Sequence, residues 1–310
     1  MTNLVQCNYK LWRQVRRLVG LALMLTLATN LLAGEQFTVE SARAAAERGN
    51  AKALYFLGRC YARGEGVPQD YTRAAGCFQA SAEKGYALAQ NDLGAFYAKG
   101  LGVKQDYAEA AKWYRKAAEK GDALAQYSLG RSYWLGRGVA TNMEASLKWL
   151  NQAAKQNQPD AMQFLGEIYL SGGSGIKPDG RQAFHWFLKA AEQGSVGALC
   201  SLGSLYEQGT GVPRNLDLAV NCYRHAAEKG DTQAQMSLGE LYMPGSELET
   251  ADLVEALKWL RLAGTHGDGH ANHLMTQLSI SGRVTQEQYG EACRRAEDFE
   301  RAFGIKPAKQ

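Results

Sequence analysis

The sequence repeats itself with an almost constant period, and this period constrains the fold more than any other feature. Leu-Gly pairs recur six times at intervals of 36, 36, 36, 37 and 36 residues. Each pair has an alanine four positions before its leucine and a tyrosine three positions after its glycine. Residues spaced by four lie along one stripe of an α-helix, so each unit is expected to begin with an amphipathic helix. The leucines of the six pairs are Leu57, Leu93, Leu129, Leu165, Leu202 and Leu238.

A second helix is expected in the rest of each unit. Its start carries aspartate or asparagine, whose side-chain oxygen accepts a free backbone N–H at a helix N-cap. Its end carries glycine or asparagine, which tolerate the left-handed conformation that often terminates helices. The predicted N-caps are Asp70, Asp106, Asn142, Asp179, Asn215 and Asp252, and the predicted ends are Gly85, Gly121, Asn157, Gly194, Gly230 and Gly267.

The repeating unit is therefore a helical hairpin, and neither of its helices can bury an apolar face alone. Stacked hairpins share one continuous core with local contacts, which predicts an all-α solenoid. Partial repeats extend the array over residues 36–282, and residues 283–310 are expected to form a C-terminal capping helix. The six full repeats span about 53–85, 89–121, 125–157, 161–194, 198–230 and 234–267.

The segment "AQNDLGAFYAKGLGVKQDYAEAAKWYRKAAEKGD" resembles the Sel1-like repeat, a close relative of the tetratricopeptide repeat. The resemblance covers about 230 residues and implies a right-handed superhelical solenoid with protein-binding surfaces. Two cysteines, Cys77 and Cys222, replace the usual aromatic residue. Repeat four has one extra residue, and "MPGSELETAD" in repeat six departs from the usual Gly-x-Gly-Val bend, which suggests a remodelled turn and a local contact site.

The first 34 residues have the pattern of an export signal. Four basic residues precede the apolar stretch "LVGLALMLTLATNLLAG", which ends in small residues. Its apolar run of about 16 residues is shorter than the roughly 20 that a spanning helix requires. This favours a cleaved signal peptide, and hence a periplasmic or secreted bacterial protein, over an N-terminal anchor that leaves the chain in the inner membrane facing the periplasm. The membrane is expected as a partner only if the segment is uncleaved.

Charge gives no reason to expect a nucleic-acid partner. The formal net charge is +4, and residues 1–34 hold four basic and no acidic side chains, so the remaining chain is close to neutral. Nucleic-acid-binding domains usually carry a basic patch and a high isoelectric point.

The sequence shows no pattern that points to catalysis or to a cofactor. The recurring Gly-x-Gly-Val bends could be taken for phosphate loops, but no strand precedes them and the Lys-Ser/Thr of such loops is missing. No nucleophile and base stand at a recognisable spacing. The histidines of "HGDGHANH" lack an evident further ligand. We therefore predict no catalytic, cofactor-binding or metal site.

The cysteines allow two disulfides, each within one hairpin. Repeats one and five each place one cysteine on either helix, which pairs Cys60 with Cys77 and Cys200 with Cys222. Export would permit such bonds. The alternative is that Cys77 and Cys222 are small buried hydrophobic residues.

Helix geometry predicts which side chains face away from the core. Offsets are counted from the alanine that stands four positions before the leucine of each Leu-Gly pair. At 100° of rotation per residue, offsets 2, 6, 9 and 10 of each first helix lie on the side opposite the core stripe. The tetratricopeptide relationship implies that these positions line a concave groove. The groove is basic and aromatic in the first three repeats and acidic in the last three. Its predicted partner-binding residues are Tyr55, Arg59, Arg63, Asn91, Lys99, Tyr127, Arg131 and Trp134.

Arginine, tyrosine and tryptophan are typical of binding hot spots. We therefore predict a non-enzymatic scaffold or adaptor that binds a protein or peptide, with an acidic or C-terminal-carboxylate peptide in the first half of the groove. The alternative for this surface is a solvated face without a partner. The alternatives for function are a β-lactamase-like or cell-wall-active enzyme, because some exported members of the resembled family have been linked to β-lactams, and a secreted host-interaction factor.

Overall fold

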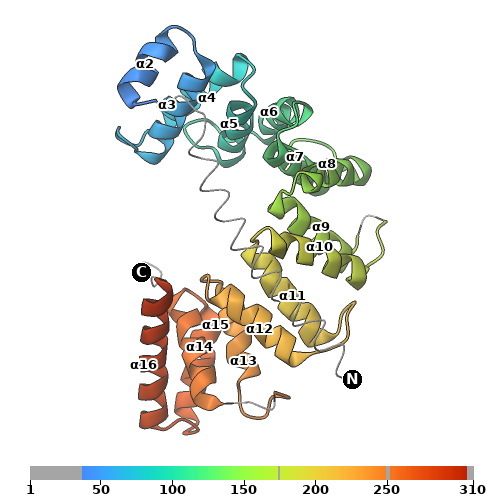
Figure 1. Ribbon diagram of the computed structural model, residues 1–310, viewed down its shortest axis with the longest axis vertical. Coiled ribbons are helices and arrows are strands. Elements are labelled where there is room, and N and C mark those ends of the chain that lie inside the picture. The colour runs from blue at the N-terminus through green and yellow to red at the C-terminus, as the bar shows by residue number, and fades with distance from the viewer. Residues whose placement is uncertain (1–36, 174, 249–251, 306–310) are drawn as a thin grey trace. The chain divides into compact units, whose positions relative to one another are not determined.

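The protein is built of α-helices and divides into two compact units (Figure 1). The computed structural model describes residues 37–173, 175–248 and 252–305, and the predicted leader 1–34 lies outside these ranges. Within them the regular elements are helices, and a single isolated β-bridge joins Gly173 and Ile176. Unit 1 ends at Leu165 and unit 2 begins at Gly166. This confirms the predicted all-α repeat fold.

The helices follow the predicted hairpin pattern, with a first (A) and a second (B) helix in each repeat. Helix α2 precedes the first full hairpin and α15 follows the last one. In unit 1 the helices are α2 (Val39–Glu47), α3 (Ala51–Arg63), α4 (Tyr71–Glu83), α5 (Ala87–Lys99), α6 (Tyr107–Glu119), α7 (Ala123–Leu135) and α8 (Met143–Lys155). Helix α9 (Pro159–Ser171) begins in unit 1 and ends in unit 2, which continues with α10 (Gly180–Glu192), α11 (Val196–Gln208), α12 (Leu216–Ala227), α13 (Thr232–Leu241), α14 (Leu253–Thr265), α15 (Gly269–Ile280) and α16 (Gln286–Phe303).

The B helices begin and end at the predicted residues. Asp70 caps α4 by accepting the backbone N–H of Arg73 at 2.9 Å, and the other five predicted N-caps accept in the same way. Asn157 has a φ of 61°, and it is the only non-glycine residue of the described ranges with a positive φ. The six N-caps and the left-handed residue confirm that short polar side chains and glycines define the hairpins.

The glycine of each Leu-Gly pair allows the two helices of its hairpin to pack closely. A Cβ on Gly94 would lie 2.8 Å from the ring of Tyr114, which is too close for any side chain. The same approach recurs in every repeat, against the B-helix residues Phe78, Leu150, Phe187, Tyr223 and Leu260. In each hairpin, a bulky side chain of the B helix therefore packs directly against the glycine of the A helix, in the space that a Cβ would otherwise fill.

The Gly-x-Gly bends pack against the preceding repeat. Gly102 has a φ of +64°, and a Cβ there would lie 2.2 Å from the carbonyl carbon of Tyr71, at the start of α4. Gly138 approaches Tyr107, at the start of α6, in the same way. The second glycine of each bend is therefore explained by contact between repeats, in agreement with the interpretation of these glycines as turn residues.

Glutamine side chains connect successive repeats, and the sequence pattern did not predict them. Gln126 donates to the carbonyl oxygen of Ala118 at 3.2 Å, and its own side-chain oxygen accepts from Gln156 Nε2 at 2.8 Å. Gln156 also donates to the carbonyl oxygen of Gly121 at 3.0 Å. These amides satisfy backbone groups at the ends of the B helices, where carbonyls lack partners within the helix.

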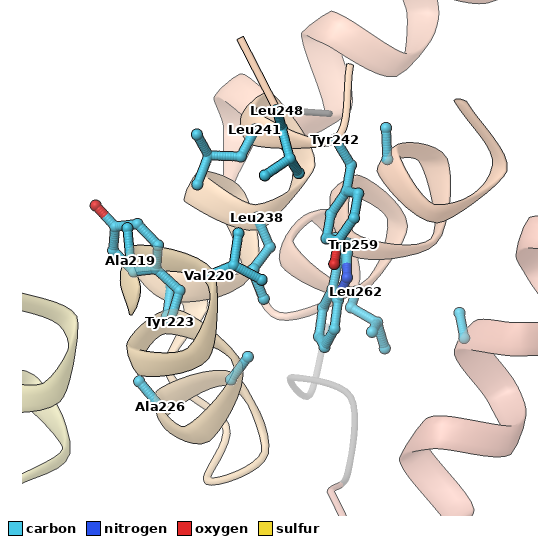
Figure 2. Packing of buried hydrophobic residues seen from close by; sticks show 14 residues of the cluster. Ala219, Val220, Tyr223, Ala226, Leu238, Leu241, Tyr242, Leu248, Trp259 and Leu262 are labelled. Atoms are coloured by element: carbon cyan, nitrogen blue, oxygen red, sulfur yellow. The ribbon is translucent and has the colours of Figure 1, made fainter. Parts of the chain in front are cut away.

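The remodelled bend of repeat six folds back onto the core of unit 2. Leu248 is only 6% exposed and packs with Leu241 and Tyr242 in the cluster that also holds Trp259 (Figure 2). Beside it, Glu247 pairs with Arg214 of the preceding bend at 2.5 Å. The described part of this segment thus has a packing role; its residues 249–251 lie outside the described ranges.

The C-terminal helix α16 covers the last B helix. It begins with a capping box between Thr285 and Gln288. The other helices pack mainly on the helix next to them in the chain, whereas α16 packs on α14. Phe299 contacts the ring of Trp259 edge-on at a centroid distance of 4.9 Å. No helix within the described ranges combines the length and the hydrophobicity that a membrane span requires.

Candidate protein-binding face

The eight predicted binding residues lie on α3, α5 and α7, the A helices of the first three repeats, and we call them the N-terminal face. Arg59, Arg63, Lys99 and Arg131 are exposed, whereas the aromatic residues Tyr55, Tyr127 and Trp134 are half-buried. Asn91 differs from the prediction, because it is only 5% exposed.

Asn91 is buried because it belongs to a polar cluster centred on Asp92. Asn91 Nδ2 donates to Asp92 Oδ1 at 3.2 Å, and the hydroxyl of Tyr55 donates to the same carboxylate. Asn91 Oδ1 is buried without a hydrogen-bond partner among the described residues. Asn91 therefore lies beneath the N-terminal face, where it hydrogen-bonds to Asp92, and is not itself a surface residue.

Burial dominates the electrostatics of this cluster. Burial raises the pKa of Asp92, although hydrogen bonds from Asn91 and Tyr55 and the charge of Arg59 oppose the shift. Burial also raises the pKa of Tyr55 to about 12, and the negative charge of Asp92 adds to this rise. Sequence reasoning missed Asp92, which lies at offset 3, one position beyond the offset that was predicted to face away from the core.

The aromatic rings of the N-terminal face are fixed by other rings. Tyr55 lies 5.2 Å from Tyr86 and 5.8 Å from Phe78 between ring centroids, and the guanidinium of Arg59 lies 5.9 Å from the centroid of the Tyr55 ring. Tyr127 and Trp134 both contact Phe164, at 6.3 and 6.1 Å. Rings held in this way lose little conformational freedom when a partner binds, which favours their use as contact residues.

A pocket lies where α5, α6 and α7 meet. Helix α7 contributes Arg131, helix α6 contributes Tyr114, and the bend after α7 contributes Arg137. Burial raises the pKa of Tyr114 to about 12, and its hydroxyl shares a hydrogen bond with Ser128. The remaining lining residues are Ala98, Tyr107, Ala110, Tyr127, Ser128, Ser132 and Leu135.

The corresponding surface of unit 2 has the opposite charge. Glu240 occupies the position of Arg131, and burial together with Glu207 and Asp268 raises its pKa, while His270 opposes the shift. Residues 37–165 contain 17 lysines and arginines against 12 aspartates and glutamates, a net charge of +5. Residues 166–310 contain 14 against 18, a net charge of −4. The charge asymmetry in the sequence therefore extends to each unit as a whole.

The five described cysteines are free thiols, so neither Cys60–Cys77 nor Cys200–Cys222 is a disulfide in the structure. Cys77 packs against the cluster of α2 and α3 residues that precedes its helix. The thiol of Cys200 forms a hydrogen bond with Asp231, and burial raises the pKa of Cys222 to about 12. Cys77 and Cys222 therefore pack as small apolar residues.

Each of the three histidines of "HGDGHANH" contacts a different residue. His266 Nδ1 is 2.8 Å from Gln235 Oε1, His273 Nε2 is 2.8 Å from Gln277, and His270 Nε2 is 4.0 Å from Glu240. Within the described ranges, no three or more His, Cys, Asp or Glu side chains come together in an arrangement that could hold a metal ion.

Comparisons with known proteins agree with the hairpin repeat. The family profile described as Sel1 repeat matches six consecutive segments, residues 51–86, 87–122, 123–158, 159–195, 196–231 and 232–268. No curated protein matches the chain significantly.

Two solved structures resemble the chain over most of its length. One is c5321, a protective antigen of uropathogenic Escherichia coli with an SLR fold, at 33% identity and a TM-score of 0.70; the match covers 86% of this chain and 59% of that one. The other is a Sel1 repeat protein from Oxalobacter formigenes, at 29% identity and a TM-score of 0.66, covering 73% of this chain and 99% of that one. With six matched repeats and the hairpin geometry described above, the chain belongs to the Sel1 repeat family, whose members generally mediate protein–protein interactions.

Proposed function

We propose that this protein is an exported, non-enzymatic scaffold that binds a protein partner through its N-terminal face. The observation that carries the proposal is the combination of exposed cations and fixed aromatic rings on three successive A helices. Arg131 forms neither an ion pair nor a hydrogen bond with any described residue, so its charge is available to a partner. Arginine beside tyrosine and tryptophan is the composition that dominates binding energy in protein interfaces.

The partner-binding proposal is tested by reversing the charge of the face. The double variant Arg59→Glu with Arg131→Glu is compared with the wild type in a cross-linking pull-down from the native cell envelope. A matched control, Lys112→Glu with Lys148→Glu, makes the same change in net charge on the exposed B-helix surfaces of α6 and α8. We expect the first variant to lose the cross-linked partner and the control to keep it. Equal capture by both variants would show that the N-terminal face is not the binding surface.

The export proposal rests on the leader pattern of residues 1–34. Mass spectrometry of the protein isolated from its native cell should show a mature N-terminus near residue 35, in the periplasmic or secreted fraction. An intact Met1 in the membrane fraction would instead establish the anchored alternative.

The non-enzymatic part of the proposal rests on the Sel1 repeat family, whose members are typically non-enzymatic scaffolds. Purified protein should hydrolyse the chromogenic β-lactam nitrocefin no faster than buffer does. A turnover rate that scales with protein concentration would refute this part of the proposal.

A further inference from the structure

We infer that the pocket between α5, α6 and α7 is the subsite that receives an aspartate or glutamate side chain of an extended partner peptide. This inference rests on the proposed function and names the chemistry that the N-terminal face would recognise. Its basis is the charge and the hydrogen-bonding state of the side chains that line the pocket.

The pocket has two cations and no acidic lining residue. Arg131 projects from α7, and Arg137 follows α7 in the bend that packs on the start of α6. The guanidinium of Arg137 lies 5.7 Å from the ring centroid of Tyr107, and like Arg131 it forms no ion pair with a described residue. Two unpaired guanidinium groups at one pocket favour an anion, and their planar fork matches a carboxylate.

Several other polar groups of the pocket are engaged with one another. The hydroxyl of Ser132 donates to the carbonyl oxygen of Ser128 at 2.8 Å, the side chain of Ser128 is bonded to Tyr114, and the hydroxyl of Tyr107 accepts from Gln105 Nε2 at 3.1 Å. The two arginines are therefore the charged donors of the pocket. The remaining lining is aromatic or small and apolar, which suits the methylene groups of an acidic side chain.

Unit 2 contains the same hairpin positions with the charge reversed. Tyr223 and Ser237 correspond to Tyr114 and Ser128, but the pocket that they line in unit 2 is otherwise formed from different positions, among them Asp231. In unit 2 the position of Arg131 is taken by Glu240 and that of Tyr127 by Met236, and neither of these side chains lines that pocket. The common scaffold therefore does not by itself create an anion site; the arginines of unit 1 do.

The occupant is an acidic residue within a peptide rather than a small acid, because the charged surface continues beyond the pocket. Arg59 and the fixed ring of Tyr55 lie on α3, two A helices away from Arg131 on α7, along the same set of predicted positions. An extended chain presents side chains at intervals that can contact both groups, whereas a free acid would use only the pocket.

The test begins with peptides selected from a random display library against the full chain. Binding of the strongest peptide is measured by fluorescence anisotropy to the wild type, Arg131→Gln, Arg137→Gln and the matched control Glu240→Gln. The peptide is also made with its acidic residue replaced by the corresponding amide, and with an amidated C-terminus.

We expect the selected peptides to share an acidic residue, and its replacement by the amide to weaken binding to the wild type about tenfold or more. Arg131→Gln should cause a similar loss, and in that variant the acidic and amide peptides should bind equally, as a direct contact requires. Glu240→Gln should leave the affinity unchanged, and circular dichroism should show all variants folded.

Three results would overturn the inference. Selected peptides without an acidic residue, or unchanged binding to Arg131→Gln, would show that the pocket does not receive a carboxylate. A loss caused by C-terminal amidation rather than by the side-chain change would assign the pocket to a chain end. In each case the proposed scaffold function would still be judged separately, by the cross-linking experiment with the charge-reversed face.

Discussion

At the scale of single residues, Asp92 shows how one half-buried carboxylate organises a surface. It accepts hydrogen bonds from Tyr55 of one repeat and from its neighbour Asn91, and thereby orients the ring of Tyr55. Burial of a carboxylate disfavours its charged form, even when it is hydrogen-bonded. Asp92 therefore orients the binding face and reduces the stability of the fold at neutral pH.

Replacing Asp92 by asparagine should raise the melting temperature at pH 7. Because the folded protein has a raised pKa at Asp92, it binds this proton more tightly than the unfolded chain does. Stability therefore falls as the pH rises through the raised pKa, and the penalty is absent below the ordinary pKa of the carboxyl. Thermal unfolding followed by circular dichroism should show a gain for Asp92→Asn at pH 7 that disappears near pH 3.5.

The control for this prediction is Asp160→Asn, which changes an exposed carboxylate in the first turn of α9. It should give no gain at either pH. A lower melting temperature for Asp92→Asn at pH 7 would mean that the hydrogen bonds of the carboxylate outweigh the cost of its burial.

At the scale of elements, the bends connect repeats through contacts that leave no room for a side chain. The Gly-x-Gly bends that follow α3, α5, α7 and α11 lie against the first turn of the helix before each of these, so the same glycine that permits the turn also permits the contact. The glycines of "GLGVKQD" are explained by this packing, because Gly102 lies against the backbone of Tyr71 and a helix, not a strand, precedes the bend.

The variant Gly102→Ala should destabilise unit 1 by about 3 kcal/mol or more, because its Cβ meets backbone atoms of α4 and its φ is positive. Gly121→Ala is the matched control: its φ is also positive, at +90°, but nothing lies within 4 Å of the new Cβ. The free energy of unfolding of the control should fall by only about 1–2 kcal/mol. Urea unfolding of both variants separates the two effects, and equal losses would show that the bend can move away from α4.

At the scale of the whole molecule, stability is a sum of contacts between neighbours along the chain. Within each unit the extensive helix contacts join consecutive helices, and α16 is the exception because it packs on α14. Repeat proteins with such local contacts can lose one part of the array while the rest remains folded. The two units should therefore respond separately to local damage.

Phe299→Ala should destabilise unit 2 by about 2 kcal/mol, because it removes the edge-on contact with the buried ring of Trp259. Hydrogen exchange should quicken at the amides of α13 and α14 and remain unchanged in α3 to α7. Phe303→Ala, at a residue that is 46% exposed, is the control and should have a much smaller effect. Faster exchange in unit 1 would contradict the local character of the array.

The sequence predicted most of the fold because its signals are local and occur six times. The N-caps, the left-handed ends and the glycines of the Leu-Gly pairs act within one hairpin, and repetition distinguishes them from chance. Asn91 was predicted to be a contact residue but is buried, and its neighbour Asp92 was not singled out at all. How far these two side chains are covered depends on neighbouring repeats, which helix angles alone do not describe.

By itself, then, the sequence determined the hairpins, their number and the basic character of the first three repeats. Only the tertiary structure decided which side chains from different helices meet: the glutamine links to the B-helix ends, the packing of α16 on α14, and the pocket that places Arg131 of α7 beside Tyr114 of α6. The physical reason is the distance along the chain that separates the interacting residues. Helix caps and turns are set by residues a few positions apart, whereas these contacts join side chains from different helices, whose distances depend on how the helices pack.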